Sequence, residues 1–131
     1  MTKVEMKEDI RRAAVGGMRE IEPGTVARTY RFALEFPGFG GHFPDFPILP
    51  AVAQLLAALC LAEDWGVRPL RLLAVEHAKF LLQLRPQQEI VVQCREHRKD
   101  GRQLLDCRLW REEQLAASFS LVVADREAGS C

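Results

Sequence analysis

The feature that most constrains this chain is an apolar run over residues 51–62, in which Gln54 is the only polar side chain. Pro50, just before the run, suits the first position of a helix, because the N–H that proline lacks would have no partner there. Trp65-Gly66, followed by Pro69, is typical of a helix end. A helix without a polar face must be buried on all sides. At about 12 residues the run is too short to cross a bilayer, which takes roughly 20, so we expect a buried central helix.

The composition excludes several classes of protein. The 131 residues suit a single domain, and 18 basic against 18 acidic residues give a formal net charge of zero, so no overall field attracts nucleic acid or a membrane. The start of the chain is charged and lacks the apolar segment of a secretory signal, which favours a cytoplasmic protein. The four cysteines have neither CxxC spacing nor histidines at ligand spacing, so we expect no metal site.

Alternating apolar and polar residues predict strands on both sides of the helix. The predicted strands cover residues 13–21, 25–34, 70–82, 89–98, 103–112 and 115–123. We expect residues 1–10 to be weakly ordered and residues 125–131 to form a polar tail, which leaves a single domain over residues 11–124. One helix that is apolar on every side, together with this much strand, predicts an α+β fold in which a curved antiparallel sheet wraps around the helix.

The dipeptide Asp100-Gly101 lies between two alternating runs and is a strong signal for a two-residue hairpin turn. This turn pairs Lys99 with Arg102 and, farther along the strands, Cys94 with Cys107. The cysteines then form a non-hydrogen-bonded pair, in which side chains come closest. A disulfide is geometrically conceivable at such a pair, but a reducing cytoplasm favours two packed thiols.

The segment before the helix carries the motif Gly41-His42-Phe43-Pro44, followed by Pro47 and Pro50. This pattern resembles the signature GHFPGxPxxPG of the hotdog-fold 3-hydroxyacyl-acyl carrier protein dehydratases. A second block, His77-Ala78-Lys79-Phe80 followed by Arg85-Pro86, is similar to that family's KARF…RPGD segment. Within the family, residues 50–55 (PAVAQL) most resemble the PGVxQLDW segment of the aryl-polyene dehydratase branch.

The resemblance implies a hotdog fold and the dehydration of 3-hydroxyacyl thioesters, on acyl carrier protein or coenzyme A, in fatty-acid or polyene biosynthesis without a cofactor. His42 would be the base, and the N–H of Ala51 at the helix start would stabilise the thioester oxygen. The implied substrate-binding residues are Phe43, Phe46, Pro47, Pro50, Gln54 and Phe80. A basic patch that would attract an acidic carrier protein consists of Arg68, Arg71, Lys79 and Arg85.

Each of these residues also has a simpler interpretation. Gln54 could satisfy a backbone group, the phenylalanines could pack in the core or an interface, and the basic residues could be solvated surface charges. His77 and His97 alternate along predicted strands, and we assign them no role. Long alternating strands leave sheet edges that need partners, so we expect a homodimer or a heterodimer with another hotdog protein, with the sheets joined edge to edge.

The chain departs from the family pattern at two positions. Ala51 replaces the glycine that usually follows the last proline, and Leu56 occupies the position of the acid, fourteen residues after His42. In the homodimers of the family, the other subunit supplies this acid. Asp45 is only three residues from His42 in a turn and is a poor geometric substitute. Two functions therefore remain open: a dehydratase, or a catalytically silent acyl-binding hotdog that pairs with an active paralogue. A third function, thioester hydrolysis, would need a carboxylate that the helix does not offer at this site.

Overall fold

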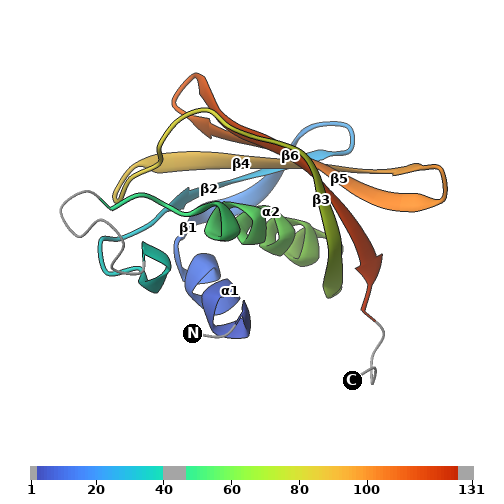
Figure 1. Cartoon of the computed structure of the whole chain (residues 1–131), viewed down its shortest axis with the longest axis horizontal. Helices are drawn as coiled ribbons and strands as arrows, with labels where there is room; N and C mark the ends of the chain where they lie inside the picture. The colour runs from blue at the N-terminus through green and yellow to red at the C-terminus, as the bar shows by residue number, and fades with distance from the viewer. Residues whose placement is uncertain (1–2, 40–46, 127–131) are drawn as a thin grey trace.

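The computed structural model describes residues 3–39 and 47–126. Along the chain, its elements are α1 (Lys3–Arg12), β1 (Ala14–Glu22), β2 (Thr25–Arg31), the 3₁₀ helix η1 (Pro37–Phe39), α2 (Ala51–Gly66), β3 (Leu70–Phe80), β4 (Glu89–Lys99), β5 (Arg102–Arg111) and β6 (Gln114–Asp125). Antiparallel pairing joins the strands in one sheet in the order β1-β2-β4-β5-β6-β3. Figure 1 shows the sheet curving around α2, with α1 below the helix. The predicted α+β class and curved antiparallel sheet are confirmed.

The central helix α2 lies within the curve of the sheet because its side chains are apolar on every face that the sheet covers. Leu56, Leu59 and Leu61 are at most 3% exposed. The inward-facing side chains of the sheet that join the same core include Tyr30, Val92, Leu109 and Leu121. Within the part of the chain that the structure describes, no helix is long and apolar enough to cross a membrane.

The N-terminal helix α1 differs from the weak order expected for residues 1–10. Its Ile10 is fully buried, and its Lys7 and Arg11 form ion pairs of 3.1 and 3.0 Å with Glu63 near the end of α2. The sequence did not reveal this helix because the residues that hold it lie more than fifty positions away along the chain.

The carboxylate of Glu63 connects three elements although it is only 7% exposed. It accepts hydrogen bonds from Lys7 and Arg11 of α1 and from the backbone N–H of Leu70, which begins β3, at 2.8 Å. A buried carboxylate needs such partners, and a carboxylate near the C-terminal end of a helix is otherwise disfavoured by the helix dipole. The two cations of α1 therefore stabilise the end of α2 as well as their own helix.

The hairpin between β4 and β5 has the predicted register. Asp100 and Gly101 have positive φ angles of 54° and 76°, as a type I′ turn requires. Lys99 pairs with Arg102, and Cys94 pairs with Cys107. The two cysteine Sγ atoms lie 3.6 Å apart as free thiols. Burial raises the pKa of the Cys107 thiol well above its usual value. Both thiols are buried, and that of Cys94 donates a hydrogen bond of 3.2 Å to the carbonyl of Ala58.

Helix α2 ends at a strained residue. Val67 adopts the left-handed conformation (φ 50°, ψ 46°), and its side chain is 88% exposed. A β-branched residue in this conformation has a steric clash that costs free energy. The exposed side chain of Val67 gains no burial energy that would offset this cost. We expect Val67→Gly to raise the free energy of unfolding by about 1 kcal/mol, measured by urea denaturation.

The matched control is Val52→Gly, which makes the same change at a half-exposed position inside the first turn of α2. There glycine should lower the free energy of unfolding by about 0.5–1 kcal/mol. If both variants lose stability equally, Val67 is not strained.

Candidate functional site

The loop that carries the histidine motif lies in part outside the residues that the structure describes. His42, Phe43 and Phe46, which are the predicted base and two predicted substrate contacts, fall in that part, and so does Asp45. The structure describes the chain again from Pro47. The described part of the candidate site consists of residues 47–50, the start of α2 and the segments around them.

The start of α2 offers unpaired backbone donors. Pro50 is extended (φ −71°, ψ 158°), and its carbonyl accepts hydrogen bonds from the N–H groups of Ala53 and Gln54 at 3.1 and 3.2 Å. Pro50, the N-cap residue, makes no side-chain capping hydrogen bond. Among the described residues, the N–H groups of Ala51 and Val52 have no partner, and both residues are exposed. Two free donors and the positive end of the helix dipole can stabilise a developing oxyanion.

Gln54 fixes the position of this helix start. The side chain is 4% exposed, and its Nε2 donates a hydrogen bond of 3.1 Å to the carbonyl of Leu49. The N–H of Leu49 in turn donates to the carbonyl of Leu84 at 2.7 Å. Residues 47–50 are thus held from the helix on one side and from the segment after β3 on the other. Gln54 does satisfy a backbone group, which is the simpler of its two predicted roles.

Leu84 was not identified from the sequence. It contributes through its backbone carbonyl, and no side-chain pattern reveals such a contact. The residue is fully buried, so the segment after β3 is anchored both by packing and by the hydrogen bond to Leu49.

The side chains around the helix start are apolar and exposed. Phe80, at the end of β3, is 45% exposed, and its ring packs against Phe119 at a centroid distance of 6.2 Å. Leu81 and Val52 are 55% and 51% exposed. Pro47 and Pro50 are half-buried. An exposed apolar surface of this kind suits either an acyl chain or a partner subunit.

Leu56 is in the core of its own subunit. It is 3% exposed and belongs to the cluster between α2 and the sheet. The carboxylates of α2 are Glu63 and Asp64, at the far end of the helix, where Lys7 and Arg11 bind them. At 1.5 Å per residue, Glu63 lies roughly 18 Å along the helix from Ala51. The helix therefore offers no acid beside its own free donors.

The predicted carrier-binding patch does not form one surface. Strand β3 carries the chain from the C-terminal end of α2 back to its start, so Arg71 and Lys79 lie roughly 26 Å apart along the strand. Arg68, also near the C-terminal end of α2, is occupied by ion pairs of 2.8 Å with Asp125 and 2.5 Å with Glu96. Lys79 is exposed. Only Lys79 and Arg85, which follows Leu84, lie toward the helix start.

Comparison with solved structures shows the fold. The chain is similar to the ApeI:P dehydratase heterocomplex from Xenorhabdus doucetiae, at 19% identity and TM-score 0.69, covering 85% of this chain and 96% of that chain. It is also similar to a hypothetical thioesterase protein with coenzyme A from Streptococcus pneumoniae TIGR4, at 9% identity and TM-score 0.64, covering 97% and 100% of the two chains. An uncharacterised protein from Erwinia carotovora matches at 18% identity and TM-score 0.65, covering 86% and 95%.

A search of curated proteins finds no match. A family model, by contrast, matches most of the sequence: the model for the ApeI dehydratase covers residues 19–120. That range runs from β1 through most of β6 and includes the histidine motif, the start of α2 and the block around Phe80. The chain therefore belongs to the ApeI-like dehydratase family and has the hotdog fold.

Proposed function

We propose that this protein is a subunit of a 3-hydroxyacyl-thioester dehydratase that acts on acyl carrier protein or coenzyme A thioesters in cytoplasmic fatty-acid or polyene biosynthesis. The observation that carries the proposal is the start of α2, where the N–H groups of Ala51 and Val52, which have no partner within the described part of the chain, follow directly on the histidine motif. In this proposal these donors bind the thioester carbonyl oxygen, and His42, nine residues before Ala51 in the sequence, acts on the neighbouring carbon.

Dehydration needs three groups at this place. His42 removes the proton from the carbon beside the thioester carbonyl, and negative charge develops on the carbonyl oxygen. The N–H of Ala51 and the helix dipole stabilise that charge. The 3-hydroxyl group then leaves as water, which requires a proton from an acid. Leu56 cannot donate a proton, so a homodimer of this chain lacks the third group.

A partner subunit would supply the missing acid. Strand β3 is an edge of the sheet, and its Leu73, Val75 and Phe80 are 52%, 39% and 45% exposed. An edge with unpaired backbone groups and exposed apolar side chains suits pairing with another strand. A second hotdog subunit joined there would bring its own helix near the start of α2. The solved ApeI:P complex is described as a dehydratase heterocomplex, which supports a heterodimer for this chain.

The alternative function is a silent acyl-binding subunit. The burial of Leu56 in the core favours it, because the acid position here serves packing. In that case the chain binds thioesters or stabilises an active paralogue without turning over substrate.

The first test concerns the proposed base and donor. His42→Ala should abolish dehydration of a 3-hydroxyacyl thioester, whether the chain is assayed alone or with its partner. Ala51→Pro deletes the N–H that binds the carbonyl oxygen and should weaken thioester binding, measured by calorimetry. Ala51→Gly keeps that N–H and should bind more tightly than Ala51→Pro. Equal turnover by wild type and a folded His42→Ala variant would exclude the dehydratase mechanism.

The second test concerns the acid. A positioned general acid contributes about 10²–10⁴-fold to the rate, so the wild-type homodimer should be slower than a homologue with the acid by that factor. Leu56→Asp or Leu56→Glu should recover part of the rate at some loss of stability, because the position is buried.

Leu55→Asp is the matched control, since it adds a carboxylate one position away at a half-buried residue. Fast wild-type turnover would mean that another residue acts as the acid. Failure of both folded Leu56 variants to gain activity, with no thioester binding by the wild type, would favour the silent subunit.

The third test concerns the paired edge. Val75→Lys places a charge on β3 and should shift the protein from dimer to monomer in sedimentation at micromolar concentration. Val15→Lys makes the same change on β1, the opposite edge, where Val15 is 42% exposed, and should leave the dimer intact. A monomeric wild type, or a dimer broken only by Val15→Lys, would contradict the proposed edge.

A further inference from the structure

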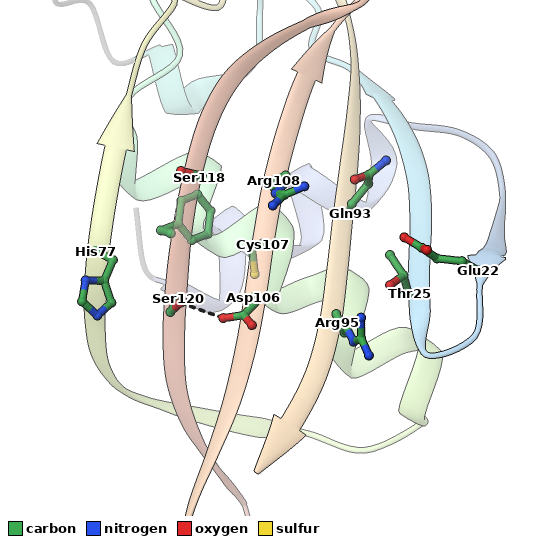
Figure 2. A pocket seen from close by; sticks show the side chains of 11 residues that line it. Glu22, Thr25, His77, Gln93, Arg95, Asp106, Cys107, Arg108, Ser118 and Ser120 are labelled. Carbon is green, nitrogen blue, oxygen red and sulfur yellow. Dashed lines mark hydrogen bonds between the residues drawn. The ribbon is translucent and has the colours of Figure 1, made fainter. Parts of the chain in front are cut away.

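The face of the sheet opposite α2 carries a hollow of about 360 Å³ (Figure 2). Along β5, Cys107 and Leu109 point toward α2 and are buried, whereas Asp106 and Arg108 point outward and are exposed. The outward side chains of the neighbouring strands complete the hollow. The hollow is therefore separate from the helix start, and a ligand could bind in it whether or not the protein is a dehydratase.

One row of outward side chains forms the floor of the hollow. Gln93 of β4 pairs with Arg108 of β5, and Arg108 pairs with Ser118 of β6. On the other side of Gln93, the paired residue of β2 is Ala27. Direct cross-strand neighbours have Cβ atoms about 5 Å apart. Gln93 and Arg108 are thus flanked directly by the small residues Ala27 and Ser118, beyond which the row continues to Arg19 of β1 and Lys79 of β3.

The two arginines of the hollow lack anionic partners. Arg108 has only the uncharged Gln93 and Ser118 as direct neighbours. Arg95 lies opposite Asp106, but that carboxylate instead accepts a hydrogen bond of 2.8 Å from Ser120, and its other oxygen lies 2.7 Å from His97 Nε2. Among the described residues, neither arginine forms an ion pair.

Other exposed arginines of this protein do find carboxylates. Arg102 pairs with Glu76 at 2.8 Å, and Arg68 pairs with Asp125 at the same distance. The contrast distinguishes the hollow as a place where two arginines make no ion pair among the described residues, although the carboxylates of Glu22 and Asp106 also line it.

A further donor faces the same space. The Oε1 atom of Gln93 accepts a hydrogen bond of 3.0 Å from the indole N–H of Trp110. The remaining polar group of Gln93 is its amide NH₂, which can only donate. Figure 2 shows the oxygen of Gln93 on the side of Arg108 and its NH₂ group directed away from Arg108, toward β2. The donors of the hollow are the NH₂ group of Gln93, the hydroxyl of Ser118 and the guanidinium groups of Arg95 and Arg108. These are more donors than the two oxygens of a carboxylate can use.

We propose that this hollow binds the phosphate group of a small phosphorylated, hydroxyl-bearing metabolite. Arginine forks match phosphate oxygens in pairs, and the volume lies within the range of about 300–1,000 Å³ typical of small-molecule sites. The opposite side of the hollow is lined by Glu22 and Thr25. A carboxylate and a hydroxyl there suit the hydroxyl groups of such a ligand and disfavour a second phosphate.

The experiment uses inorganic phosphate and glycerol 3-phosphate as probes, titrated into the whole protein at constant ionic strength. Backbone amide resonances should shift most at positions 93 and 108, and glycerol 3-phosphate should bind more tightly than phosphate. Arg108→Gln should weaken both probes at least tenfold. Its matched control is Arg98→Gln, which removes the same charge from an exposed residue near the β4 end and should leave binding unchanged.

Three results would overturn the proposal. Chloride at equal ionic strength could produce the same shifts, which would mean that only screening was observed. Wild type and Arg108→Gln could bind the probes equally. Finally, Arg108→Gln could change the sedimentation of the protein while no probe binds, which would identify this face as a contact between protein chains.

Discussion

The structure depends above all on the burial of α2. A helix with Leu56, Leu59 and Leu61 on its sides cannot be left in water, because each leucine gains roughly 1.5–3 kcal/mol from burial. The sheet covers most of the helix, and α1 packs against it through Ile10. This arrangement leaves the first turn of α2 accessible, and there the N–H groups of Ala51 and Val52 have no partner among the residues that the structure describes. The packing that stabilises the fold therefore also exposes the candidate site.

The parts of the fold that could be predicted from the sequence are those fixed by local pattern. The run 51–62 located α2, and Asp100-Gly101 gave the register that pairs Cys94 with Cys107. The helix α1 could not be predicted, because its Lys7 forms an ion pair with Glu63, which lies more than fifty positions later in the chain. Non-local ion pairs leave no periodic signal in the chain.

Some parts of the candidate site could likewise be predicted from the sequence, and others could not. The motif identified the helix start, where the N–H of Ala51 has no partner among the described residues, and the oxyanion role that the resemblance implied for it stays a prediction. The carrier patch was predicted from the charge of its residues, because basic side chains attract an acidic carrier protein. Strand β3 separates Arg71 from Lys79 in space because it spans the whole length of α2. The hollow around Arg108 escaped prediction because its residues come from different strands, each of which alone has the ordinary polar face of a sheet.

The bond from the N–H of Leu49 to the carbonyl of Leu84 has an evolutionary consequence. It joins main chain to main chain, so it survives most substitutions at either residue that keep the packing. The exposed neighbours Phe80 and Leu81 are then free to vary without moving the helix start. The side chains around the helix start can therefore change in size while the N–H groups of Ala51 and Val52 keep their position.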